Sequence, residues 1–204
     1  MKDTVASLIR NMVKENNHNM NISFPAVVVG IERLEDGFID VKPVVRYSNS
    51  FTGETTDYPI LREVPLISPS TKNSTICFPI NQGDYVDLLI QSVDIQKFVN
   101  GDGDIHDPDI PAYGNLANVV AIVGFTPYQQ SAFNPNNYTN DFNNQDLNIV
   151  HNKNTNSESI ISINTDGDIS LKSPTKVVVE CKEFEVNASE KIKLTSPLIS
   201  ENGR

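Results

Sequence analysis

The sequence lacks tryptophan, has only 7% aromatic residues and two cysteines, and carries fewer basic than acidic side chains. Two cysteines 104 positions apart, Cys77 and Cys181, do not form a disulfide framework, so the fold is not expected to need an oxidising compartment. With 16 Lys and Arg against 26 Asp and Glu, the formal charge is -10, which argues against nucleic acid or anionic lipid as partner. No apolar run approaches the roughly 20 residues of a membrane span. Residues 1–17 contain no uninterrupted apolar stretch, so we expect no signal peptide.

Motifs of catalysis and metal binding are also missing from the chain. The three histidines, His18, His106 and His151, stand far apart, and no HxH, HExxH or CxxC spacing occurs. No serine lies in a G-x-S-x-G elbow, and no glycine-rich phosphate or dinucleotide loop is present. The sequence therefore predicts no enzyme activity, no catalytic residue, no cofactor and no metal.

The acidic loop GDGDIHDPD is the strongest remaining candidate for a cation site. It surrounds His106 with four aspartates, Asp102, Asp104, Asp107 and Asp109. Hard cations bind clustered carboxylates, but an EF-hand loop that starts at Asp102 would need a glycine where Asp107 stands and a glutamate where Tyr113 stands. We interpret the loop as solvated and acidic.

Composition divides the chain into segments. Hydrophobic residues make up 38%, which suits one core but is little for a single globule of 204 residues, so we expect a segment that buries its apolar side chains in another way. Asparagine is concentrated, with ten of 24 in residues 129–158, where no hydrophobic period is present. We interpret this stretch as an irregular linker. The predicted parts are a helix within 1–20, a barrel domain over 21–128, the linker over 129–158 and a needle over 159–204.

The N-terminal segment has the spacing of an amphipathic helix. Its apolar residues recur every three or four positions: Val5, Leu8, Ile9, Met12 and Val13. This predicts a helix over residues 3–15, which packs either on its own domain or on a neighbouring subunit.

From residue 21 the hydrophobic period changes to two, which is typical of strands. Phe24–Arg33 and Gly37–Tyr47 are predicted to form a hairpin around the turn residues Glu35, Asp36 and Gly37. Further predicted strands are Tyr58–Leu66, Thr75–Phe78, Asp84–Gln91 and Asn118–Phe125. Five or six short strands in about 100 residues predict an all-β domain of the OB type. OB-folds often bind single-stranded nucleic acid, but residues 21–128 carry a net charge of -8, so we expect none here.

A five-fold repeat follows the Asn-rich stretch. Each block has the order large apolar, any, large apolar, any, small, and the blocks start 8, 8, 7 and 8 residues apart. The first residues of the blocks are Ile161, Ile169, Val177, Phe184 and Ile192. A fixed period of this kind indicates a solenoid or array.

One copy of the repeat cannot close a core, because its inner face would stay wet and its strand edges would stay unpaired. Three copies wound around one axis solve both problems, which predicts an intertwined, triple-stranded β-helix in a homotrimer. A plain meander packed on the barrel is the alternative. The outward positions are nearly all polar, as at Ser162, Glu180 and Glu185. The predicted trimer core consists of Ile161, Ile163, Ile169, Leu171, Val177, Val179, Cys181, Phe184, Val186, Ala188, Ile192 and Leu194.

Taken together, the two halves resemble a known family. The fragments NISFPAVVVGIERLEDGFIDVKPVV, YPILREVPL, STICFPINQGDYVDLLIQ and NVVAIVGFTP stand in the order found in central-spike proteins of contractile-tailed phages, of the Gp138 type. These proteins are related in design to the baseplate assembly protein V group. The likeness covers about residues 1–128, and the repeat is similar to the triple-stranded β-helix of the same spikes.

The resemblance implies a homotrimer in the virion, at the centre of the tail baseplate, that is assembled in the host cytoplasm. The OB domain would contact hub or tail-tube proteins, and the needle would be driven through the host envelope when the sheath contracts. Many such spikes carry an HxH iron site at the tip, which this sequence lacks, so the tip is expected to be absent, blunt or supplied by a separate protein at the C-terminus. The spike of a tailocin or a type VI-like injection system fits equally well, and a trimeric host-binding tail fibre is the alternative of another class.

Overall fold

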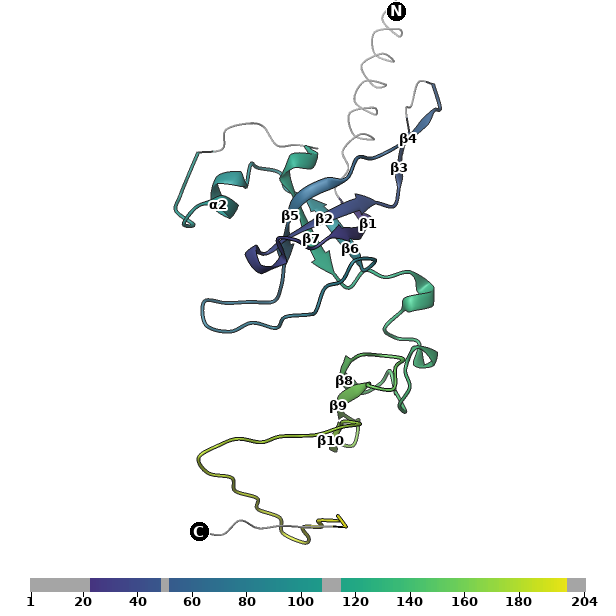
Figure 1. The fold of residues 1–204 in the computed structure, drawn as a ribbon, viewed down its shortest axis with the longest axis vertical. Coiled ribbons are helices and arrows are strands. Elements are labelled where there is room, and N and C mark those ends of the chain that lie inside the picture. Colours follow the sequence, from purple (N-terminus) through teal and green to yellow (C-terminus); the bar gives the residue numbers. More distant parts are fainter. Residues whose placement is uncertain (1–22, 49–51, 108–114, 198–204) are drawn as a thin grey trace, which may run out of the picture. The chain divides into compact units, whose positions relative to one another are not determined.

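The structure is a computed structural model that describes residues 23–48, 52–107 and 115–197 (Figure 1). The chain divides into two compact units, Met1–Ser131 and Ala132–Arg204. It is mostly β, and α2 (Gln96–Asn100) is the one α-helix among the described residues. The helix predicted over residues 3–15 lies outside them.

The first unit is built on a closed five-stranded barrel in the order β1-β2-β5-β7-β6, with β6 pairing back onto β1. The strands are β1 (Ser23–Gly30), β2 (Phe38–Pro43), β5 (Leu61–Ile67), β6 (Tyr85–Ile90) and β7 (Val119–Val123). All pairs are antiparallel except β5 with β7, which is parallel. The prediction of an OB-like barrel is confirmed at this level.

Alternation along the strands fills the barrel. In β1 every second side chain from Phe24 onward is buried, as the period of two requires. The interior consists of Phe24, Ala26, Val28, Ile39, Val41, Val64, Ile80, Val86, Leu88, Val119 and Ala121. The β1–β2 hairpin is also confirmed: its connection contains a short 3-10 turn, η1 (Leu34–Asp36), which ends at Gly37 with a φ of 85°. That left-handed conformation favours glycine.

Two parts of the barrel unit differ from the prediction. Thr75–Phe78 forms no strand; Thr75 makes an isolated bridge with Ser70, and the segment has no other strand pairing with the residues that the structure describes. Ile76 and Phe78 are both exposed, so the short alternation does not face the core. The predicted strand Gly37–Tyr47 is interrupted after Pro43, and its end belongs to β3 (Arg46–Ser48), which forms a small hairpin with β4 (Thr55–Asp57) that was not predicted. Its residues are all exposed, so no hydrophobic alternation marks it.

The second unit contains a three-stranded antiparallel sheet in the order β10-β9-β8. Its strands are β8 (Leu147–His151), β9 (Ser159–Ile163) and β10 (Ile169–Lys172). Because β8 lies inside residues 129–158, the interpretation of that stretch as a linker without regular structure is wrong for this part. The stretch also contains a short 3-10 turn, η4 (Pro135–Asn137), and its first residues end another, η3 (Tyr128–Gln130), in the first unit. The side chain of Asn134 accepts a hydrogen bond from the amide of Asn136 and so caps η4.

The five repeat blocks do not share one conformation. The first two form β9 and β10, which pair antiparallel within the chain. The three later blocks lie in residues 174–197, which we call the extended segment. This segment forms no strand ladder with any residue that the structure describes.

Candidate self-association surface

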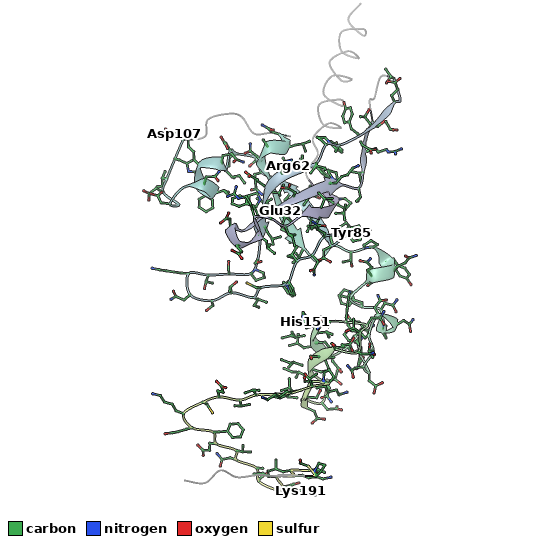
Figure 2. The ribbon with its side chains drawn as sticks, viewed as in Figure 1. Glu32, Arg62, Tyr85, Asp107, His151 and Lys191 are labelled. Atoms are coloured by element: carbon green, nitrogen blue, oxygen red, sulfur yellow. The ribbon has the colours of Figure 1, made fainter. Side chains whose placement is uncertain are left out.

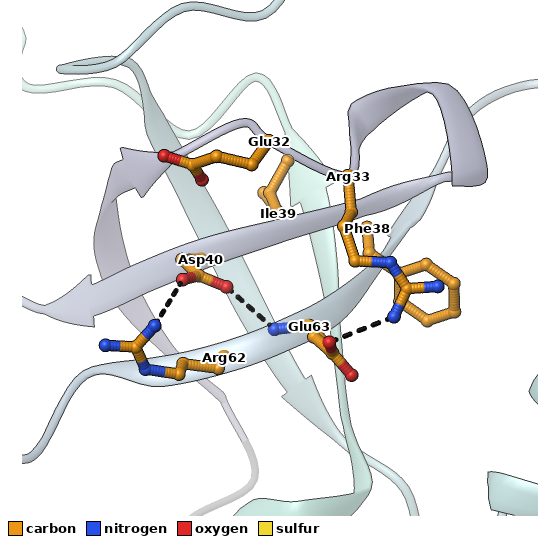
Figure 3. A pocket seen from close by; sticks show the side chains of 7 residues that line it. All are labelled: Glu32, Arg33, Phe38, Ile39, Asp40, Arg62 and Glu63. Atoms are coloured by element: carbon orange, nitrogen blue, oxygen red, sulfur yellow. Dashed lines mark hydrogen bonds and ion pairs between the residues drawn. The ribbon is translucent and has the colours of Figure 1, made fainter.

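The barrel has a small pocket beside the β1–β2 turn, with a volume of about 220 Å³ (Figure 3). It is lined by Glu32, Arg33, Phe38, Ile39, Asp40, Arg62 and Glu63. Arg33 Nη1 lies 2.9 Å from Glu63 Oε1, and Arg62 Nη1 lies 3.6 Å from Asp40 Oδ2. OB-folds bind oligonucleotides near these strands and loops. Here three carboxylates surround two paired arginines, so the charge of this pocket opposes phosphate binding.

Asp40 shapes the barrel at this pocket. Ile39 pairs with Val64 and Val41 pairs with Leu61, so Asp40 alone stands opposite the two residues Arg62 and Glu63, in a bulge. The Asp40 Oδ1 atom accepts a hydrogen bond of 2.9 Å from the backbone amide of Glu63. Glu63 has a φ of 54°, which is uncommon for a residue other than glycine. The hydrogen bond to Asp40 therefore helps to hold the backbone of β5 in this uncommon conformation at Glu63.

We expect Asp40→Ala to lower the free energy of unfolding of the barrel by about 1–3 kcal/mol, because the amide of Glu63 loses a charged acceptor. Urea denaturation followed by circular dichroism measures the change. Asp36→Ala is the matched control, because it removes an exposed ion pair with Arg33 in the same pocket region and should change little. Equal losses in both variants would contradict this role for Asp40.

The described residues of the acidic loop, up to Asp107, form no metal centre. Over the described ranges, no group of three or more His, Cys, Asp or Glu side chains is placed to hold a metal ion. Asp104 donates its backbone amide to the Asp102 carboxylate at 3.2 Å, and Asp109 lies outside the described residues. Among all the residues that the structure describes, no helix is both long and apolar enough to cross a membrane.

The clearest candidate surface is one face of the β8–β9–β10 sheet, which we call the apolar face. Strand register aligns its side chains in two rows across the sheet. One row consists of Leu147, Ile163 and Ile169, and the other consists of Ile149, Ile161 and Leu171. All six are exposed, with exposed fractions between 38% and 73%. Exposed aliphatic rows of this kind make the face a candidate for contact with another protein, a membrane or a ligand.

The opposite face of the sheet is different in character. Asn148, Ser162 and Ser170 form one row across it, while Ile160, next to that row on β9, is 3% exposed. The predicted outward residues Ser162 and Lys172 thus lie on the other side from Ile161 and Leu171, as strand alternation requires.

The structure brings together four of the predicted core residues, Ile161, Ile163, Ile169 and Leu171, on the apolar face. Leu147 and Ile149 on the same face were missed, because they lie in the Asn-rich stretch. The signal was present, since Leu147-Asn148-Ile149 has the apolar–polar–apolar order of the repeat blocks.

The other predicted core residues lie on the extended segment and are all exposed. Figure 2 shows side chains standing out from this segment, with Lys191 near its end. The large ones are 51–76% exposed: Val177, Val179, Phe184, Val186, Ile192 and Leu194. Cys181 and Ala188 are also exposed. Asn187 Nδ2 donates a hydrogen bond of 2.7 Å to Glu185 Oε1, which puts these two polar side chains on one side of the chain. Alternation therefore places Phe184 and Val186 on the other side.

Glu158, just before β9, organises the Asn-rich stretch and was not found from the sequence. It is 2% exposed. Its Oε1 atom accepts from the backbone and side-chain nitrogens of Asn140, at 2.7 and 2.9 Å. Its Oε2 atom accepts from the backbone amides of Thr139 and Asn154, at 3.0 and 2.8 Å. Burial by itself would raise the pKa of this carboxyl, but these hydrogen bonds outweigh it and hold the pKa below its ordinary 4.5.

Aromatic side chains complete this loop structure. Tyr138 stacks on Phe142 with ring centroids 3.8 Å apart, and its hydroxyl donates to the carbonyl of Ala132 at 2.7 Å. Burial raises the pKa of Tyr138, and the negative charge of Glu158 adds to this effect. No sequence motif announces such a site, because one carboxylate in a polar stretch looks the same whether it is buried or solvated.

The described residues provide exposed apolar surfaces, but they bring together no set of catalytic or metal-binding side chains. Compared with models of known protein families and with curated proteins, the chain matches none. Function therefore has to be inferred from the residues themselves.

Proposed function

We propose that this chain is the structural central spike of a phage tail baseplate, a non-enzymatic homotrimer whose needle pierces the host envelope when the sheath contracts. The observation that carries the proposal is the exposed apolar surface of the second unit. Thirteen large hydrophobic side chains between Leu147 and Leu194 are exposed in the single chain. Monomeric proteins rarely expose contiguous apolar patches larger than a few hundred Å².

The energetics favour association of several copies. Burying one aliphatic side chain of this size contributes roughly 1.5–3 kcal/mol. Covering the whole exposed set would therefore stabilise an assembly strongly relative to the single chain. A threefold arrangement covers the same surface on every copy and closes on itself, which an open-ended stack does not. The octad spacing of the blocks repeats this contact along the axis.

The same arrangement suits a mechanical role. Strands held between three chains distribute an axial load over many backbone hydrogen bonds and a dry interior. The OB-like barrel, with its closed core, supplies a separate folded unit that would attach to hub and tail-tube proteins. No step of piercing requires a catalytic residue, a cofactor or a metal.

The first test is the mass of the protein in solution. Light scattering at micromolar concentration is expected to give about three times 22.6 kDa, because two further copies are needed to cover the apolar surface of each copy. A monomer with its β-sheet circular dichroism intact would contradict the proposal. In purified tail particles, quantitative mass spectrometry is expected to find three copies of this chain per tail. Many more copies per tail would instead indicate a fibre.

A further inference from the structure

We infer that the contact between copies begins at β8, before the repeat, and that the apolar face receives the extended segment of a second copy. This inference rests on the proposed function and names the partner of the surface described above. Three observations within the second unit carry it: a groove, two sets of unpaired strand edges, and a match of charge.

The groove lies on the apolar face where β10 ends, and its volume is about 300 Å³. Its apolar walls come from Ile149, Ile161, Leu171 and Val177, with Lys176 beside them. Lys172, whose side chain belongs to the opposite face of β10, also lines the groove at the end of the strand. Val177 is the first residue of the third block, so the groove is continuous with the repeat. Ile149 on β8 supplies a wall, which extends the surface into the stretch before the repeat.

Backbone hydrogen bonding points to an extended chain as the occupant. In the described ranges, β8 and β10 have no further strand beyond them, so each leaves one edge open. The extended segment of the same chain has no strand partner there either. Open edges and an extended chain satisfy each other by strand addition. Figure 1 shows the chain leading away from β10 instead of folding back along it, and we therefore assign the added strand to a second copy.

The charge of the groove is opposite in sign to that of residues 177–188, the part of the extended segment that contains the third and fourth blocks. Among the described residues that line the groove, none is acidic, and Lys172 and Lys176 are basic. The third and fourth blocks, residues 177–188, carry three glutamates against one lysine: Glu180, Glu183, Glu185 and Lys182. An extended segment from a second copy thus brings apolar side chains to the groove wall and carboxylates to its basic edge.

Photo-crosslinking identifies the occupant directly. A photoreactive amino acid is placed at position 149 of the full chain, and copies labelled with ¹⁴N and ¹⁵N are mixed, refolded together and irradiated. The expected product is a mixed-isotope dimer in which position 149 is joined to a peptide from residues 174–197. Cross-links only within one chain, or only to a second β8–β10 sheet, would overturn the inference.

A charge placed on the apolar face gives an independent measurement. Because Ile149 is 65% exposed in the single chain, Ile149→Glu should leave the fold of one copy intact. It should increase dissociation of the trimer at least tenfold, because the carboxylate would be buried between copies. Asn156→Glu adds the same charge at an exposed position between β8 and β9 and should have no effect.

The outcomes separate this inference from the proposed function. A trimeric wild type whose dissociation is unchanged by Ile149→Glu overturns the contact at β8 and leaves the spike proposal standing. A monomeric wild type overturns both. A trimer that dissociates on Ile149→Glu, but not on Asn156→Glu, supports both.

Discussion

Val186→Asp is expected to convert the proposed trimer into monomers. Val186 lies on the apolar side of the fourth block, opposite the side occupied by Glu185 and Asn187. In a threefold needle one substitution places three carboxylates around one axis in an apolar interior. Burying an unpaired carboxylate costs several kcal/mol, so the dissociation constant should rise roughly a hundredfold or more. Analytical ultracentrifugation over a range of concentrations measures this change.

The neighbouring position provides the matched control. Asn187→Asp adds the same carboxylate one position further along, on the side that is expected to face solvent, so dissociation should change little. If Asn187→Asp dissociates the trimer and Val186→Asp does not, the two faces of the block have been assigned the wrong way round. If both variants behave like the wild type, this block is not part of the contact.

Glu158→Ala is expected to open the Asn-rich stretch of every copy. The substitution leaves the backbone amides of Thr139, Asn140 and Asn154 without their acceptor. A hydrogen bond to a charged group contributes about 1.5–3 kcal/mol, but water can replace the carboxylate at the exposed residues Thr139 and Asn154, so we expect a loss of about 1–3 kcal/mol in local stability. Amide hydrogen exchange at these three residues measures it. Glu190→Ala, at an exposed position, should leave the exchange unchanged.

Lowering the pH should destabilise the Asn-rich stretch in the same way as Glu158→Ala does. Because the pKa of Glu158 is held below its ordinary 4.5, the carboxylate stabilises the folded state fully above about that pH. The stabilisation is lost as the pH falls through the lower folded-state pKa. Protection factors of Thr139 and Asn140 should therefore fall below pH 4.5 in the wild type. Glu158→Gln should lose part of the protection at every pH and show no such step; a step of the same size in Glu158→Gln would assign the titration to another group.

The barrel could be predicted from the sequence because its strands obey a simple period. In β1, β2 and β6 alternate side chains are buried and apolar, and Gly37 marks the turn between the first two. The repeat was found for the same reason. In both cases the pattern is local, and one face of each strand points to one environment.

The elements that were missed depend on partners that no local pattern reveals. The strand β8 has only two residues of clear alternation, Leu147 and Ile149, and the surrounding asparagines hide them. Glu158 is buried because loops up to 19 residues away fold around it. The hairpin of β3 and β4 carries an exposed ion pair, with Arg46 Nε 2.8 Å from Asp57 Oδ1, and buries no residue. Thr75–Phe78 shows the opposite case, an alternation that finds no neighbouring strand in the described part of the chain.

The β8–β9–β10 meander has a consequence for the order of assembly. Its strands are joined by short connections, of seven residues between β8 and β9 and five between β9 and β10, so each copy closes the meander by itself within microseconds. The extended segment has no such local partner and must wait for an encounter with other copies, which is slower and depends on concentration. In the proposed trimer, the extended segment of one copy would therefore dock first on the finished meander of another and fix the relative register of the chains. The later blocks would then wind together one after another from that end, so that a misaligned start is corrected before the needle is complete.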